Sequence, residues 1–108
     1  MTDYKELEEN LRSIGLTNSE AKVYLALLKM GSSSKGTILK EAKIAPSKVY
    51  NVLDKLMDKG LVSFIVKDNI RHFSAAPVSK IIYYISKKRL ELERQERKIK
   101  KLESGLEI

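Results

Sequence analysis

Apolar residues recur at intervals of three and four along residues 46–61, the spacing that lines one face of an α-helix. The members of this apolar face are Val49, Val52, Leu53 and Leu56. Pro46 suits the first helical turn, where its missing N–H would be unpaired anyway, and Gly60 suits the position just after a helix. The pattern therefore predicts one amphipathic helix over residues 46–59, and the other elements are expected to pack around it.

Three shorter helices are predicted ahead of this one. The first carries a narrow apolar stripe, formed by Tyr4, Leu7, Leu11 and Ile14. The second begins at a capping box, in which the side chains of Thr17 and Glu20 each accept a backbone N–H. The third has Ser34 as its N-cap. The turn that follows the third helix contains no glycine, so Lys43 or Ala45 must form it.

After Gly60 the apolar periodicity changes from helical to strand-like. Residues 61–66 and 70–75 are rich in β-branched and aromatic side chains, and the three residues between them have the composition of a turn. These features predict a β-hairpin with a basic tip, which has Lys67 before the turn and Arg71 after it. Two strands alone are marginally stable in water, so the hairpin is expected to pack on the helices.

Beyond Pro77, one apolar residue recurs at every seventh position. These a positions of a heptad are Val78, Ile85, Leu92, Ile99 and Leu106, and the d positions that follow are Ile81, Lys88, Gln95 and Leu102. Because the rest of this helix is densely charged, it is either a solvated tail helix or one helix of an intermolecular seam, in which the apolar stripe packs against a second chain. We favour the seam, because only the first helix remains as a partner within the chain.

The formal net charge is +7, and the basic excess lies in the middle and at the end of the chain. Residues 1–33 carry four basic and five acidic side chains, a net charge of −1. Residues 34–72 carry eight and four, and residues 73–108 carry nine and five, a net charge of +4 in each case. Such an excess favours polyanionic partners, with nucleic acid ahead of acidic membrane.

Several classes of function have no support in this sequence of 108 residues, which is the size of one domain. The chain has no cysteine, and His72 is its single histidine, so no metal site or other cofactor is predicted. It has no glycine-rich phosphate loop, and scattered carboxylates on helices are solvated charges, so no enzymatic activity is predicted. No apolar run approaches the ~20 residues that cross a bilayer, and the N-terminus is too polar for a signal peptide. A cytoplasmic protein is therefore expected.

The order of helices followed by a basic hairpin predicts a mostly α-helical winged helix-turn-helix with a small β-hairpin and a long C-terminal helix. Residues 1–76 would form the DNA-binding unit, and residues 77–108 a dimerisation helix of the same structural unit. The second helix of a helix-turn-helix enters the major groove. We therefore expect helix 46–59 to be the recognition helix and the wing, residues 66–71, to meet the backbone or an adjacent minor groove. The predicted function is that of a homodimeric transcriptional regulator that binds specific double-stranded DNA.

Three segments carry a family resemblance: LTNSEAKVYLALLKMG (16–31), IAPSKVYNVLDKLMDKGLV (44–62) and FSAAP (73–77). Together, in this order and spacing, they resemble the TrmB-like family of winged-helix transcriptional regulators over about residues 4–85. The resemblance implies a DNA-binding winged helix that is usually dimeric and found mainly in archaea. Where this family often has an arginine before the recognition-helix serine, this chain has Pro46. Larger members carry a C-terminal sugar-sensing domain; none is expected in this sequence, and no small-molecule effector is inferred.

Eight side chains are the candidate DNA contacts: Lys35, Ser47, Lys48, Tyr50, Asn51, Lys55, Lys67 and Arg71. The resemblance matches Ser47, Lys48, Tyr50 and Asn51 to the start of the family's recognition helix. Lys48 and Asn51 are the candidates for base edges, because lysine meets guanine acceptors and asparagine can pair with adenine. Lys35 and Ser47, at helix N-termini, are expected at phosphates. Tyr50 either faces DNA or packs under its helix with only the hydroxyl exposed.

The candidate residues of a homodimer interface are Tyr4, Leu7, Leu11, Val78, Ile81, Ile85, Leu92, Ile99 and Leu102. Two C-terminal helices would cross antiparallel near Leu92, or one would pack against the first helix of the partner, with Lys88 and Gln95 fixing the register. The alternative function is a winged-helix module of a general transcription or assembly factor that docks a protein. A membrane-surface helix fits poorly, because the stripe has no tryptophan or phenylalanine anchor.

Overall fold

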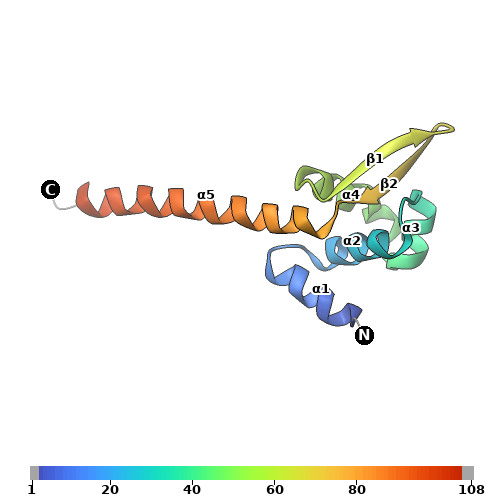
Figure 1. The fold of residues 1–108 in the computed structure, drawn as a ribbon, viewed down its shortest axis with the longest axis horizontal. Helices are drawn as coiled ribbons and strands as arrows, with labels where there is room; N and C mark the ends of the chain where they lie inside the picture. The colour runs from blue at the N-terminus through green and yellow to red at the C-terminus, as the bar shows by residue number, and fades with distance from the viewer. Residues whose placement is uncertain (1–2, 106–108) are drawn as a thin grey trace.

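The computed structural model of the protein describes residues 3–105. In chain order its elements are α1 (Tyr4–Ser13), α2 (Asn18–Met30), α3 (Lys35–Ala42), the 3-10 turn η1 (Pro46–Lys48), α4 (Val49–Asp58), β1 (Val62–Lys67), β2 (Ile70–Ala75) and α5 (Val78–Gly105). Helices α1–α4 and the hairpin form one unit, and α5 extends from it in the direction opposite to the hairpin (Figure 1). The predicted winged helix-turn-helix with a long C-terminal helix is confirmed. Leu106 of the heptad lies outside the described residues.

Helix α2 supplies much of the core. Val23, Tyr24 and Leu27 on α2 are at most 1% exposed, and they lie in one cluster with the buried face of α4. That face consists of Val49, Val52, Leu53 and Leu56, as their spacing predicts. Packing of this buried face on the core therefore determines which side of α4 is exposed to solvent.

The predicted capping box at the start of α2 is confirmed, and its acid is also part of a buried ion pair. Glu20 is 1% exposed, and its carboxylate accepts hydrogen bonds from the backbone N–H of Thr17 and the ammonium of Lys59, each at 2.7 Å. Burial alone would raise the pKa of Glu20, but the hydrogen bonds from Lys59 and Thr17 and the attraction to the Lys59 charge outweigh it and lower this pKa. Because Lys59 directly follows α4, the pair ties α2 to the C-terminal end of α4.

We expect Glu20→Gln to lower the free energy of unfolding by about 1–3 kcal/mol at neutral pH, because the variant loses two charge-assisted hydrogen bonds at a buried site. A carboxyl whose folded pKa is lowered contributes stability above its ordinary pKa of 4.5 and loses it as the pH falls through the folded pKa. The difference between parent and variant in urea unfolding should therefore shrink on acidification. Glu41→Gln, in an exposed pair with Lys29, is the control with a smaller expected effect. A difference that is constant with pH would contradict this origin.

The turn between α3 and α4 is formed by Lys43, which adopts the left-handed conformation with φ 56° and ψ 46°. The sequence left the choice between this residue and Ala45 open. The predicted continuous helix over residues 46–59 is divided in the structure: residues 46–48 form a 3-10 turn, and the α-helix α4 ends at Asp58. The reason is the hydrogen bond from the Lys48 N–H to the carbonyl of Ala45, which closes a tighter turn.

The hairpin pairs β1 with β2 in antiparallel register, with Phe64 opposite Phe73. Its turn has two residues, because β1 continues through Lys67. Asp68 and Asn69 both have positive φ, 53° and 62°, as the tight hairpin turns compatible with strand twist require. Phe73 is buried and pairs with Ser33 through two backbone hydrogen bonds of 2.8 and 2.9 Å, so the segment before α3 covers one edge of the hairpin.

The start of α5 is fixed to the domain by long-range hydrogen bonds. The hydroxyl of Tyr24, whose pKa is raised by burial, donates to the carbonyl of Ala76 at 2.7 Å. Further along, the ammonium of Lys88 donates to the carbonyl of Ile14 at 2.9 Å. Lys88 therefore joins α5 to the end of α1 within one chain. That it also sets the register of an intermolecular seam stays a prediction.

The heptad stripe of α5 is also divided in a way that the sequence did not predict. Ile81 and Leu11 are each 8% exposed and lie in the core of this chain, and Leu7 and Ile85 are partly buried against it. Ile81 and Ile85 of the inner half are therefore packed on the chain's own core, whereas Val78 is 57% exposed. The assignment of Leu11 and Ile81 to a dimer interface stays a prediction, and little of either side chain is exposed in the single chain.

Candidate DNA-binding surface

Helices α3 and α4, with the turn between them, form a helix-turn-helix. The polar side of η1 and α4 is exposed at Ser47, Lys48, Asn51 and Lys55, opposite the buried apolar face. Asn51 and Lys55 are one helical turn apart and share one side of α4. The same helix also exposes the carboxylates of Asp54 and Asp58, and Lys55 lies between them in the last turn.

Tyr50 does not pack under α4, which settles the alternative that the sequence left open. Its side chain is 53% exposed, and the ammonium of Lys35 lies 4.9 Å from the centre of its ring. This distance is within the range of a cation–π contact. Because Lys35 is the first residue of α3, the contact joins the N-terminal end of α3 to the exposed side of α4.

The wing carries its two predicted cations in different settings. The guanidinium of Arg71 lies 4.7 Å from the centre of the Phe64 ring, so its position on one face of the hairpin is set by an aromatic neighbour. Lys67 is exposed at the end of β1, directly before the turn. Apolar side chains near the tip are also exposed, with Ile65 at 65% and Ile70 at 52%.

A cleft of about 420 Å³ lies between the N-terminal end of α3, the exposed side of α4 and the wing. It is lined by Ser34, Lys35, Gly36, Tyr50, Asn69, Ile70, Arg71 and Phe73. Three of the predicted contacts, Lys35, Tyr50 and Arg71, therefore share one cleft although they come from three elements. Ser47, Lys48, Asn51, Lys55 and Lys67 do not line it.

The cleft also contains groups that the sequence analysis missed. Ser34 is the N-cap residue of α3, but its side chain makes no capping hydrogen bond and lies 3.5 Å from the hydroxyl of Thr37 instead. The first N–H groups of a helix have no partner within the helix, and they bind anions readily. Asn69 enters the cleft from the hairpin turn. Its position in a two-residue turn was the one available signal for it.

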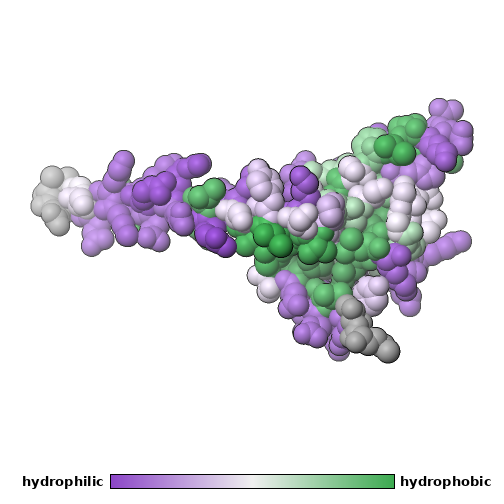
Figure 2. Space-filling view, viewed as in Figure 1, coloured by the Kyte–Doolittle hydropathy of each residue, from purple (hydrophilic) through white to green (hydrophobic). Residues whose placement is uncertain are grey.

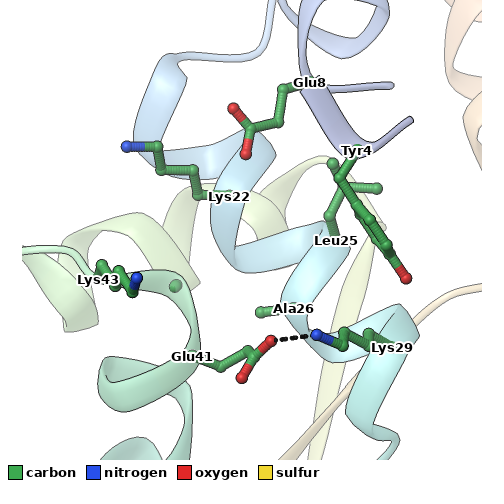
Figure 3. A pocket seen from close by; sticks show the side chains of 9 residues that line it. Tyr4, Glu8, Lys22, Leu25, Ala26, Lys29, Glu41 and Lys43 are labelled. Carbon is green, nitrogen blue, oxygen red and sulfur yellow. Dashed lines mark hydrogen bonds and ion pairs between the residues drawn. The ribbon is translucent and has the colours of Figure 1, made fainter. Parts of the chain in front are cut away.

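A second hollow, of about 320 Å³, lies between α1, α2 and α3 (Figure 3). In it Lys29 and Glu41 form an ion pair of 2.9 Å, which raises the pKa of Lys29 through a hydrogen bond and charge attraction. The ammonium of Lys29 also lies 5.8 Å from the centre of the Tyr4 ring. Tyr4, a predicted interface residue, is 46% exposed, and one face of its ring contacts Lys29 of α2.

Across residues 3–105 there is no group of histidine, aspartate or glutamate side chains arranged to hold a metal ion. Among the helices of this range, none is both long enough and apolar enough to cross a membrane.

Comparison with known proteins identifies relatives of the same fold. Over 61 residues the chain is 38% identical to the HTH-type sugar sensing transcriptional regulator TrmBL1 of Pyrococcus furiosus, which covers 56% of this chain and 18% of that protein. A solved structure of TrmBL2, described as an archaeal chromatin protein with a novel mode of DNA binding, matches 96% of this chain and 42% of its own, with a TM-score of 0.88 at 19% identity. The ST1889 protein of Sulfolobus tokodaii matches 86% of this chain and 99% of its own, with a TM-score of 0.65 at 21% identity.

The present chain thus spans less than half of the length of TrmBL1 and of TrmBL2. The structural matches show a winged-helix fold, which is shared with MarR-family transcriptional regulators such as one from Silicibacter pomeroyi, at a TM-score of 0.61. The model of the family described as sugar-specific transcriptional regulator TrmB matches residues 11–84, which is more than half of the chain. The chain therefore belongs to the TrmB family of transcriptional regulators, and it shares the winged-helix fold of DNA-binding regulators.

Proposed function

We propose that this protein is a homodimeric transcriptional regulator that binds specific sequences of double-stranded DNA. The observation that carries the proposal is the convergence of Lys35, Tyr50 and Arg71, from α3, α4 and the wing, on one cleft beside the exposed side of α4. Within this surface, α4 lies in the major groove and the wing meets the backbone or the adjacent minor groove.

The groups of this surface have different tasks. Lys48 and Asn51 contact base edges, because an ammonium meets guanine acceptors and an amide can pair with adenine. Ser47, Lys55 and the cleft at the start of α3 contact phosphates, which adds affinity and fixes orientation without reading sequence. In the cleft, the uncapped N–H groups of α3 and the ammonium of Lys35 are directed at the same anion.

The homodimer is proposed to form through the outer half of α5. There Leu92, Ile99 and Leu102 are 63%, 63% and 59% exposed, and they continue the side of the helix that packs on the core. Where α5 leaves the domain, an apolar groove of about 280 Å³ runs between α1, α2 and α5, visible as the green patch at this junction (Figure 2). Four of the predicted interface residues, Leu7, Leu11, Val78 and Ile81, are among those that line it. The partner's outer α5 is the apolar segment that fits this groove.

We expect binding to duplex DNA to weaken steeply with salt. Each phosphate neutralised by a lysine or arginine contributes about −0.9 to the slope of log K against log salt concentration. A few phosphate contacts per subunit therefore predict a slope of about −3 or steeper. Fluorescence anisotropy of a labelled genomic duplex at several salt concentrations measures it, and sequencing of the bound fragments identifies the operator.

The same measurement separates this function from the alternative, a winged helix that docks a protein. Absence of DNA binding at micromolar protein, or an affinity that does not change between low and moderate salt, would contradict the proposed function and favour the protein-docking module.

A further inference from the structure

One side of α5 is basic along most of the helix. Lys80, Lys87, Arg94 and Lys101 recur every seven residues. We define the basic stripe as these four residues together with Tyr83, Leu90, Arg97 and Lys98. At 100° per residue, all eight positions fall within an arc of about 100°. The arc contains six basic side chains and no acidic one, while Glu91 lies at its edge and the other acidic residues of α5 lie elsewhere on the helix.

The basic stripe is open to solvent. Every member is exposed, and most of the outer part of α5 that is visible in Figure 2 is hydrophilic. The side chains that attach α5 to the core, among them Ile81 and Ile85, lie on nearly the opposite side of the helix. Within α5 as described, the ion pair is Glu96 with Lys100 at 3.0 Å, outside the stripe.

Tyr83 lies between two cations at the inner end of the stripe. The ammonium groups of Lys80 and Lys87 are 5.9 and 5.5 Å from the centre of its ring, and 60% of the side chain is exposed. These contacts hold a hydroxyl donor and two ammonium groups together on the surface. Hydroxyl and ammonium groups are among the donors that proteins use for phosphate oxygens.

We propose that the basic stripe of α5 is a second surface for the DNA backbone, separate from α4 and the wing. The inference rests on the proposed function, in that DNA is taken to be the partner. Because α5 and the hairpin extend in opposite directions, the stripe meets a different stretch of duplex from the one under the wing (Figure 1). Seven residues rise about 10.5 Å, so the four heptad cations span ~32 Å, close to one turn of duplex.

A solvated tail helix and a membrane-surface helix each fit the stripe less well. A solvated helix held by ion pairs has oppositely charged neighbours at three- and four-residue spacing. Glu91 and Glu93 have that spacing from Lys87 and Arg97, but within the described part of α5 the ion pair is formed by Glu96 and Lys100, outside the stripe. A helix on an acidic membrane buries its apolar face in the lipid, but here the apolar face of the inner half packs on the domain.

The test compares two triple variants with the same charge. Lys87→Gln/Arg94→Gln/Lys101→Gln removes three cations from the stripe, and Lys5→Gln/Arg89→Gln/Lys100→Gln removes three from outside it. Each lowers the net charge from +7 to +4. On a duplex of roughly 40 base pairs, we expect the stripe variant to reduce the salt slope by ~0.9 for each lost phosphate contact, and the control to leave it nearly unchanged. Sedimentation equilibrium checks that both variants keep the oligomeric state of the parent.

Three outcomes overturn the inference. Equal slopes for the two triple variants, with DNA binding retained, overturn it and leave the proposed function intact. A parent that binds no duplex overturns the proposed function and this inference with it. Binding of the parent to phosphatidylglycerol vesicles that depends on the stripe, with an unchanged slope on DNA, would assign the stripe to lipid instead.

Discussion

The double variant Leu92→Glu/Ile99→Glu is expected to be monomeric at protein concentrations at which the parent is a dimer. Both side chains are 63% exposed in the single chain, on the uncovered continuation of the core-facing side of α5. Burial of each contributes ~1.5–3 kcal/mol, and the variant dimer loses two such side chains from each chain, so dimerisation weakens by at least roughly 10⁴-fold. The apolar burial that remains then no longer offsets the translational and rotational entropy that two chains lose on association. Sedimentation equilibrium of both proteins measures the change.

The DNA affinity of this variant should fall as well. A two-fold dimer places two recognition helices in successive major grooves roughly 34 Å apart, and it requires a pseudo-palindromic site. A monomer contacts one half-site, so it loses the increase in DNA affinity that comes from linking two DNA-binding units. Tyr83→Glu/Leu90→Glu is the matched control for dimerisation, because it adds the same charge to exposed positions on another side of α5. A parent that is monomeric at tens of micromolar, or a Leu92→Glu/Ile99→Glu variant that dimerises equally well, would show that the interface lies elsewhere.

The second large effect is expected from the side chains that read sequence. Lys48→Ala and Asn51→Ala should each reduce the preference for the operator over random duplex by ~1–3 kcal/mol, about 5- to 150-fold. The physical reason is that each removes a hydrogen bond to a base edge, which random DNA does not offer in the same geometry. Competition binding with operator and random duplexes of equal length measures this ratio.

The wing provides the control for this prediction. Lys67→Ala and Arg71→Ala should weaken binding to all sequences alike, because backbone contacts carry no sequence information. The two cations differ in how they are held. The guanidinium of Arg71 packs on the Phe64 ring, whereas Lys67 lies exposed near the tip of the hairpin. If Asn51→Ala weakens operator and random DNA equally, the reading residue has been assigned wrongly.

The candidate DNA-binding surface shows what a single sequence leaves open. The chemical character of Lys48, Asn51 and Arg71 could be read from residue type and from the predicted elements. The neighbours of Tyr50 could not, because Lys35 reaches its ring from another helix, and only the angle between α3 and α4 brings the two together. The uncapped start of α3 was hidden for a related reason: Ser34 has the right composition for a cap but its side chain lies near Thr37 instead.

The sequence alone determined the local structure of this protein. Capping by Thr17 and Glu20 sets the start of α2, apolar spacing sets the buried face of α4, and the composition of residues 61–75 sets the hairpin. Each of these signals acts between residues close along the chain, where helix and strand periodicity fix which side chains share a face.

Only the tertiary structure decided which parts of these faces remain available. The contacts of Glu20 with Lys59, Tyr24 with Ala76 and Lys88 with Ile14 join residues 39, 52 and 74 positions apart. Such partners depend on how whole helices are arranged, which no local period encodes. As a result, the regular heptad stripe of α5 is divided: Ile81 and Ile85 of its inner half pack on the core of the chain, and its outer half stays exposed because no other element of the described chain reaches it.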